Sequence, residues 1–226
     1  MSIVPGFIQF KVPENAEQLG RGVRNRAFCG GVKISKKQYL TAAHCTTEIV
    51  PEFGQIHANR PIALDGEENI VVSIKYPKDT LKIAKKEVKC TDYSCSLPKD
   101  SKWKDVALVE VLYDNDIPEA FLPRDNEYKA KINQELIVSG NELSLGVIFI
   151  KSSTPSQITA VDEISGTVKL NGVDGNIVNL GDSGSPVWRI TEDNQLQLVG
   201  VTSQKLSQLE MRFILLGPDL IAELGL

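Results

Sequence analysis

The chain has 226 residues, of which 42% are hydrophobic and 24% charged, and its mean hydropathy is −0.12. This composition is typical of globular proteins and excludes a disordered or fibrous protein. The longest uninterrupted apolar stretches, such as 146–150, are far shorter than the roughly 18 residues of a membrane span. A net charge of −4 gives no general attraction to nucleic acid or anionic lipid. We therefore expect a soluble protein with no membrane span and no nucleic-acid partner.

Short apolar segments alternate with turn residues along the whole chain, at spacings typical of antiparallel β structure. The predicted strands are 32–35, 39–42, 70–76, 107–112, 135–139, 147–150, 166–170, 186–190, 196–203 and 211–216. Only 218–226 has apolar residues at helical spacing after a Gly-Pro start, which predicts a short helix. A polar segment with two prolines, 113–128, separates the strand-rich halves. The sequence therefore predicts an all-β fold with a linker near its middle.

One stretch before residue 90 is rich in lysines that recur every three or four residues. These are Lys75, Lys78, Lys82, Lys85, Lys86 and Lys89. Charge runs of this kind are usually solvated faces, and phosphate binding is the alternative.

The four cysteines, Cys29, Cys45, Cys90 and Cys95, fall into two couples that are separate in sequence. Their even number is compatible with two disulfides, and free thiols are a second possibility. Zinc binding is a third, although there is no C-x-x-C, and the adjacent His44 and Cys45 reach one tetrahedral ion only with difficulty. Disulfides would imply an oxidising compartment.

The chain contains only two histidines, His44 and His57. His44 lies near the end of the segment YLTAAHC, in which a strand running into small residues places the imidazole where the strand gives way to a loop. A buried structural histidine is the alternative interpretation. His57 has polar, turn-like neighbours and is interpreted as an ordinary loop residue.

Ser183 lies between two glycines in GDSGSP, residues 181–186. These residue types all favour tight turns, but the glycines also leave the hydroxyl unobstructed and let backbone N–H groups converge on an oxyanion. A serine nucleophile needs a base, usually a neutral histidine. Both histidines precede Ser183, so the order serine, acid, histidine of α/β-hydrolases is excluded. In the remaining order, Asp105 at the start of an apolar strand is the candidate acid, although acidic strand starts are common.

Together these segments resemble the chymotrypsin/trypsin family of serine proteases. Residues 28–35 (FCGGVKIS) and 40–45 (LTAAHC) are similar to its first cysteine, Gly-Gly strand and catalytic-histidine motif. Residues 105–109 (DVALV), 181–186 (GDSGSP) and 198–203 (LVGVTS) are similar to its Asp-Ile-Ala-Leu motif, its Gly-Asp-Ser-Gly-Gly-Pro motif and the strand beside the substrate.

The resemblance implies two antiparallel β-barrels, 1–115 and 116–226, with an active site in the cleft between them. His44 and Asp105 would come from the first barrel and Ser183 from the second. No metal or organic cofactor is implied, and the expected partner is a protein or peptide substrate, with a protein inhibitor as a further partner.

The resemblance also implies a role for each site residue. Ser183 would attack the scissile carbonyl, His44 would accept and return the proton, and Asp105 would hold the tautomer of the imidazole. The N–H groups of Gly181 and Ser183 would form the oxyanion hole. Ser203 should lie near the buried Asp105.

The family likewise implies a Cys29–Cys45 disulfide that pins the histidine. Cys90–Cys95 has no counterpart in the family and would staple an insertion before the aspartate. Residues 1–10 lack the cationic start of a secretory signal, so the protein either stays inside or is a mature form. With disulfides, the expected location is secreted or periplasmic.

Specificity and activation depart from the family pattern. Ile177 stands where trypsin-like enzymes carry a pocket aspartate, so selection for Lys or Arg is not expected. We expect the pocket to prefer a small or aliphatic substrate side chain instead. Lys205 stands where the family has a pocket glycine, which would narrow the entrance of the pocket. The alternative is that Lys205 or Arg212 attracts an acidic substrate residue. Ile3 resembles the new N-terminal residue of zymogen-activated family members. In those relatives the terminal ammonium pairs with the aspartate before the nucleophile, which is Asp182 here. If Met1-Ser2 persist, the alternative is an inactive or zymogen-like homologue that acts as a binding module.

Overall fold

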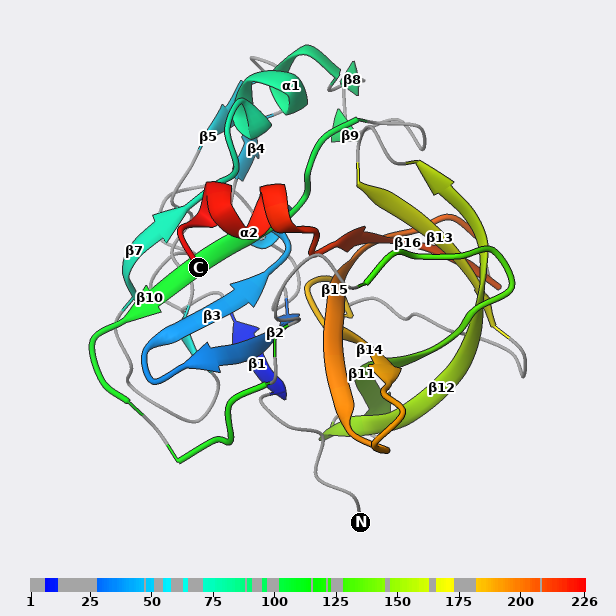
Figure 1. Ribbon diagram of the computed structural model, residues 1–226. Helices are drawn as coiled ribbons and strands as arrows, with labels where there is room; N and C mark the ends of the chain where they lie inside the picture. Colours follow the sequence, from blue (N-terminus) through cyan, green and yellow to red (C-terminus); the bar gives the residue numbers. More distant parts are fainter. Residues whose placement is uncertain are drawn as a thin grey trace.

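The protein is nearly all-β, with two β-sheets packed side by side and a short helix at its C-terminus (Figure 1). The computed structural model describes residues 7–11, 28–46, 48–50, 55–57, 63–64, 71–87, 89–90, 95–96, 102–114, 116–120, 122, 128–144, 147–162, 166–172, 182–207 and 209–226. Among these residues, no helix is both long and apolar enough to cross a membrane.

The first sheet has six strands in the order β6-β1-β2-β3-β10-β7, and every neighbouring pair is antiparallel. The strands are β1 (Phe7–Lys11), β2 (Phe28–Ser35), β3 (Gln38–Thr41), β6 (Ala63–Leu64), β7 (Val71–Lys75) and β10 (Ala107–Val111). Two further antiparallel pairs are β4 (Glu48–Val50) with β5 (Gln55–His57), and β8 (Lys89–Cys90) with β9 (Cys95–Ser96).

The second sheet closes into a six-stranded barrel in the order β11-β12-β13-β16-β15-β14. Its strands are β11 (Glu135–Ser144), β12 (Val147–Asp162), β13 (Thr167–Gly172), β14 (Pro186–Ile190), β15 (Leu196–Lys205) and β16 (Glu210–Leu215). Closure comes from β11 and β14, where Val138 pairs with Val187. Alternate residues of β12, β13 and β16 point inward, so Ile158, Leu170 and Phe213 fill the barrel.

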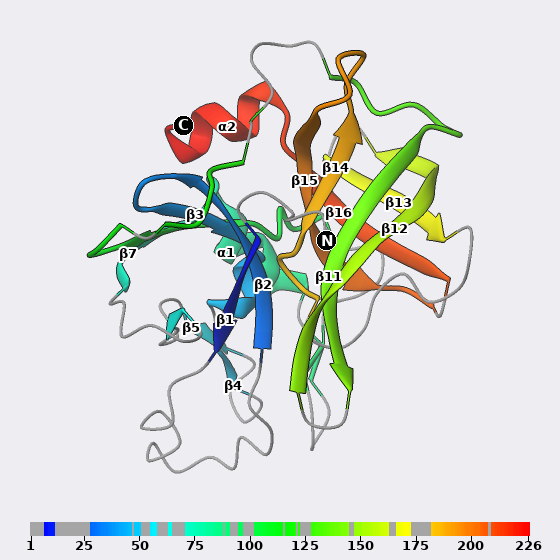
Figure 2. The ribbon, with the colours of Figure 1, turned by 90° about the horizontal axis from the view of Figure 1, so that it is seen from below.

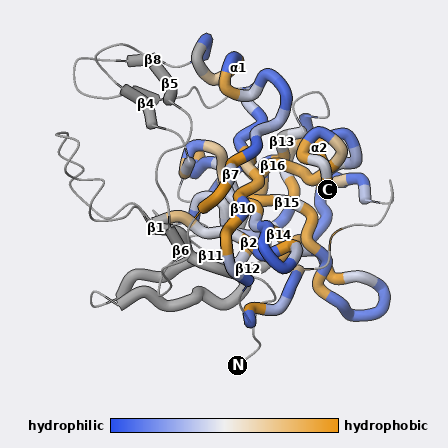
Figure 3. Tube along the Cα trace, turned by 90° about the vertical axis from the view of Figure 1, so that its left-hand side faces the viewer, coloured by the Kyte–Doolittle hydropathy of each residue, from blue (hydrophilic) through white to orange (hydrophobic). Residues whose placement is uncertain are grey.

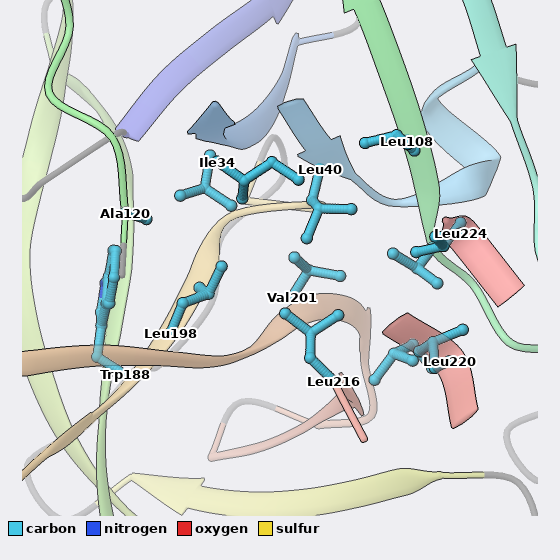
Figure 4. Close-up of a cluster of buried hydrophobic side chains, with 13 residues drawn as sticks. Ile34, Leu40, Leu108, Ala120, Trp188, Leu198, Val201, Leu216, Leu220 and Leu224 are labelled. Atoms are coloured by element: carbon cyan, nitrogen blue, oxygen red, sulfur yellow. The ribbon is translucent and has the colours of Figure 1, made fainter. Parts of the chain in front are cut away.

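The largest apolar cluster lies between the two sheets (Figure 4). Leu40 and Leu108 come from the first sheet, and Trp188, Leu198 and Val201 come from the barrel. Burying an aliphatic side chain of this size stabilises a fold by about 1.5–3 kcal/mol, so this shared core fixes the two sheets against each other. The fixed packing matters for the site, because the site takes residues from both sheets. Figure 2 shows the two sheets side by side from a second direction.

The C-terminal helix α2 (Pro218–Leu224) covers one edge of this core with Leu220 and Leu224. Pro218 starts the helix at a position where its missing N–H group is not needed. Gly225 ends the helix at a φ of 78°, a left-handed conformation that glycine adopts without strain. The short C-terminal helix predicted from the sequence is confirmed.

A second helix, α1 (Thr80–Glu87), lies within the lysine-rich stretch. The prediction of a single helix was therefore wrong. Ala84 is buried beside Trp103, whereas Lys82 and Lys86 are exposed. The lysine spacing thus marks the solvated side of an amphipathic helix. Figure 3 shows this contrast, with α1 largely hydrophilic and the central strands β10 and β15 hydrophobic.

Each of the ten predicted strands corresponds to an observed strand, so the all-β fold class is confirmed. Within the described residues only the second sheet closes, since the first has β6 and β7 at its ends. The described part of the predicted linker 113–128 contains no helix or strand. Its Ala120 N–H donates to the Lys33 carbonyl at 2.8 Å, so this connection packs against the first sheet.

Candidate active site

His44 and Asp105 meet because the strands that carry them are antiparallel neighbours. Thr41 at the end of β3 pairs with Ala107 at the start of β10. His44 lies three residues after Thr41, in the 3-10 turn Ala43–Cys45, and Asp105 lies two residues before Ala107. Both residues therefore leave the sheet at the same end.

The Asp105 carboxylate accepts three hydrogen bonds. His44 Nδ1–H donates to Oδ2 at 2.8 Å, and the His44 backbone N–H donates to Oδ1 at 2.9 Å. The Ser203 hydroxyl, from β15 of the barrel, donates to Oδ2 at 2.7 Å. An ionised carboxylate only accepts hydrogen bonds, so it fixes the proton of the imidazole on Nδ1 and leaves Nε2 as a base. Ser203 therefore lies beside Asp105, as the sequence analysis expected.

Asp105 is 3% exposed. Burial by itself raises the pKa of its carboxyl, but the charge of His44 and the hydrogen bonds from His44 and Ser203 outweigh burial and hold the pKa below its ordinary value of 3.8. Asp105 is consequently ionised at neutral pH. The His44 side chain is 33% exposed.

Ser183 occupies a tight turn that is fixed to both sheets. The Gly30 N–H of β2 donates to the Ser183 carbonyl at 2.7 Å, and the Gly184 N–H donates to the Thr202 carbonyl of β15 at 2.8 Å. Cys45 Sγ lies 3.8 Å from the Ser183 carbonyl oxygen. The structure therefore places the Ser183 backbone directly beside the segment that carries His44.

Glycine is required immediately after Ser183. Gly184 has a φ of +83°, a conformation that other residues rarely adopt. A Cβ atom here would also lie 2.7 Å from the Ala42 nitrogen and would collide with the Gly30 carbonyl. Only glycine lets the Ser183 turn approach the first sheet this closely.

Asp182 is fully buried, and its carboxylate packs against Gly140 of β11. A Cβ atom on Gly140 would lie 2.7 Å from Asp182 Oδ1. The Thr202 hydroxyl donates to the Asp182 carbonyl oxygen, and the Ser185 N–H donates to the same oxygen at 2.9 Å. Thr202 and Gly140 therefore shape the turn that positions Ser183. Gly140 lies in no sequence motif, and Thr202 lies in the family-like segment 198–203 without being singled out by it.

Several predicted site residues lie outside the described part of the chain. These are Ile3, Gly181 and Ile177. Lys205 is exposed at the end of β15, and Arg212 is buried on β16, where it pairs with Gln204.

The Cys29–Cys45 disulfide is present and ties β2 to the turn that carries His44. The second expected disulfide, Cys90–Cys95, joins two residues whose backbones are paired between β8 and β9. Their side chains lie outside the described atoms, so this disulfide stays a prediction.

Reduction with dithiothreitol should lower the melting temperature. Cleavage of Cys29–Cys45 releases a loop with a sequence separation of 16 residues. A disulfide that closes a loop of this length contributes about 3 kcal/mol to the free energy of unfolding. For a chain of this size each kcal/mol corresponds to about 2–4 °C. Calorimetry of a Cys90→Ser/Cys95→Ser variant isolates this disulfide. Equal melting temperatures with and without reductant would contradict the assignment.

Comparison with protein families shows to which family the chain belongs. The sequence profile that matches the chain is Trypsin, over residues 11–212. The chain belongs to the trypsin family.

Solved structures of trypsin-like proteases share the fold. The active form of the Rv3671c protease from M. tuberculosis has a TM-score of 0.57 and 14% identity, over 98% of this chain and 81% of that one. An inactivated protease paralogue of the scabies mite, S-I1, has a TM-score of 0.55 and 17% identity, over 94% and 90%. An inactive form of Rv3671c gives 0.55 and 15%, over 98% and 88%. At these identities the likeness establishes the fold of this trypsin-family chain.

Proposed function

We propose that the chain is a serine endopeptidase with the triad His44, Asp105 and Ser183. The observation that carries the proposal is the carboxylate of Asp105, buried and hydrogen-bonded to both His44 and Ser203. A buried carboxylate that fixes one histidine tautomer is the arrangement that makes an imidazole a directed base. Ser183 is the nucleophile because its turn is tied to the same region by the Gly30 N–H.

In the proposed reaction, Ser183 Oγ bonds to the scissile carbonyl carbon while its proton passes to His44 Nε2. The negative charge that develops on the carbonyl oxygen is stabilised by the N–H groups of Gly181 and Ser183, and loss of one such donor costs about 3–4 kcal/mol. His44 then returns the proton to the departing amine. Water repeats these steps on the acyl-enzyme and restores the Ser183 hydroxyl.

A fluorophosphonate tests this proposal directly, since its reaction needs both an activated serine and a formed oxyanion hole. We expect one covalent label on the peptide that carries Ser183, detected by mass spectrometry. His44→Ala should abolish labelling. The matched control His57→Ala, which removes the other histidine, should retain it. An unlabelled chain, or equal labelling of the two histidine variants, would overturn the proposal.

The N-terminus offers a means of activation. A chain that begins at Ile3 carries an ammonium group that we propose pairs with the buried Asp182 and orders the oxyanion loop. The chain that retains Met1-Ser2 cannot present this ammonium at Ile3. A chain that starts at Ile3 should therefore react faster with the fluorophosphonate than one that starts at Met1.

The second candidate function is a binding module that has lost catalysis. The similar fold of the scabies mite paralogue favours it, because that protein is an inactivated protease. The fluorophosphonate separates the two functions. For the peptidase, the proposed location is secreted or periplasmic, which the disulfide supports. Its proposed partners are a protein or peptide substrate and a protein inhibitor.

Substrate choice should favour small aliphatic residues before the scissile bond. Ile177 stands where trypsin-like enzymes have an aspartate, so a bound Lys or Arg side chain would lose its hydration without gaining a countercharge. Each methylene of an aliphatic side chain gains about 0.8 kcal/mol on burial. In a tetrapeptide library, cleavage after Ala, Val or Leu should exceed cleavage after Arg or Lys by roughly tenfold or more. Preference for Arg would contradict this, and preference for Glu would point to Lys205 or Arg212.

A further inference from the structure

We propose that Glu223, on the C-terminal helix α2, is a positioning residue that acts on the triad through Asp105. Its role is to hold the segment from which the Asp105 carboxylate reaches His44. The consequence for turnover rests on the proposed function. The effect on the hydrogen bond between His44 and Asp105 does not depend on that function.

The Glu223 carboxylate joins two segments that lie far apart from it in the sequence. Lys104 Nζ donates to Oε1 at 3.0 Å, and the Lys78 backbone N–H donates to Oε2 at 3.2 Å. The side chains of Lys104 and Glu223 are 28% and 29% exposed, so water screens this ion pair less than a pair on the open surface. Lys104 immediately precedes Asp105. The ion pair therefore ties α2 to the residue next to the candidate acid (Figure 1).

The backbone of Lys104 is fixed as well. The buried Thr80 hydroxyl donates to the Lys104 carbonyl oxygen at 3.4 Å, and the Val106 N–H donates to the same oxygen at 2.8 Å. Thr80 begins α1, two residues after Lys78. A closed ring of contacts beside the start of β10 thus runs through Glu223, Lys104, Thr80 and Lys78. Because the ring is closed, the start of β10 is held from more than one direction.

Apolar packing holds the other side of Asp105. Val106, the next residue, belongs to the same apolar cluster as Leu220 and Leu224 of α2, and Figure 4 shows both leucines in this cluster. Only two residues separate the end of β16 from the start of α2, so the barrel carries this helix to the first sheet. One helix therefore contributes to holding the residues on both sides of Asp105.

A small movement of Asp105 is enough to disturb the triad. Its Oδ2 accepts the His44 Nδ1–H at 2.8 Å and the Ser203 hydroxyl at 2.7 Å. Both are bonds to a charged acceptor, and their strength depends on distance and angle. A misplacement of about 1 Å can cost about 10²-fold in rate. The ion pair is partly exposed, so we expect a smaller loss in kcat without it, about three- to tenfold.

Steady-state kinetics on a peptide substrate test this expectation. Glu223→Gln keeps the length of the side chain but removes the charge that pairs with Lys104. We expect kcat to fall about three- to tenfold with KM unchanged, because the loss lies in the positioning of the triad. Asp219→Asn, the matched control, makes the same chemical change at an exposed position of α2 and should change neither constant. An unchanged kcat in Glu223→Gln, or an equal loss in Asp219→Asn, would overturn the proposal.

Lys104→Met separates positioning from a long-range effect of charge. Methionine keeps an unbranched side chain but removes the other half of the ion pair. If charge alone acted on His44, removal of the negative Glu223 and removal of the positive Lys104 would change kcat in opposite directions. Positioning predicts a loss in both variants, and it predicts that Lys104→Met/Glu223→Gln loses no more than either single variant. Opposite or additive effects would contradict the proposal.

Proton NMR of the His44 Nδ1–H follows the position of Asp105 without any turnover. A proton held in a short hydrogen bond to a carboxylate resonates far downfield, and its resonance moves upfield as the bond lengthens. The background is Ser183→Ala at a pH where His44 is protonated. Glu223→Gln should shift or broaden the resonance, and Asp219→Asn should not.

The two readouts fail separately. If no form of the chain cleaves a peptide, the proposed function fails, and the NMR signal still decides whether Glu223 positions Asp105. A resonance that is the same in Glu223→Gln as in the Ser183→Ala background would overturn the positioning role, whatever the kinetics show.

Discussion

Ser183→Ala is expected to lower kcat/KM on a peptide substrate by at least about 10³-fold, because removal of one member of a triad removes the covalent mechanism as a whole. Stability should change little. The contacts that fix this turn are made by the backbone of Ser183, whose carbonyl accepts the Gly30 N–H. Steady-state kinetics and thermal unfolding on the same preparations measure both quantities.

Ser185→Ala is the matched control. Ser185 lies two residues away and is fully buried, and its hydroxyl has no hydrogen-bond partner among the described residues. The substitution removes the same oxygen from the same turn but should leave turnover within a few-fold of the wild type. A loss below about 10³-fold for Ser183→Ala, or equal losses for the two variants, would argue against a covalent serine mechanism.

The strands could be predicted from the sequence because each is a run of apolar residues between turn signals. β12 shows the limit of this method. Its predicted part, 147–150, is apolar, but its second half contains the buried polar residue Ser156, between Pro155 and Gln157. A polar residue on an inward-facing position breaks the alternation on which the prediction depends. Helix α1 was not predicted for a related reason, because a helix with only one narrow apolar side has the sequence pattern of a charge run.

Some site residues could likewise be predicted from local motifs, whereas others depend on contacts between residues far apart in the sequence. His44, Asp105 and Ser183 each lie in a short segment with its own pattern, and these patterns identified them. Gly140 lies in no such segment, and Thr202 lies in the segment 198–203 without being singled out by its pattern. They act on the Ser183 turn through contacts with Asp182 that depend on how β15 and β11 pack in the barrel. Contacts of this kind follow from the closed sheet, which no single segment specifies.

Asp105→Asn is expected to reduce kcat by about 10⁴-fold, the loss typical of a triad with the wrong histidine tautomer. In the wild type, the Asp105 carboxylate accepts hydrogen bonds on both oxygens, from His44 and from Ser203. An amide has a single oxygen and an NH₂ group. If the NH₂ faces His44 Nδ1, the ring proton must move to Nε2, which then cannot accept a proton from Ser183. If it faces the His44 backbone N–H, two donors meet in a buried site.

The pH dependence of stability gives a second measurement on Asp105→Asn. In the wild type the pKa of Asp105 is lowered in the folded state, so ionisation of this group stabilises the fold at pH values above its ordinary pKa of 3.8. This contribution is lost as the pH falls from 3.8 through the lower folded value. Asparagine does not titrate, so the free-energy difference between wild type and variant should narrow in acid. Asp193→Asn, at an exposed turn residue, is the control and should leave kcat unchanged. A difference between wild type and Asp105→Asn that is constant below pH 3.8, or an Asp105→Asn enzyme within tenfold of wild-type kcat, would show that Asp105 does not act as the ionised partner of His44.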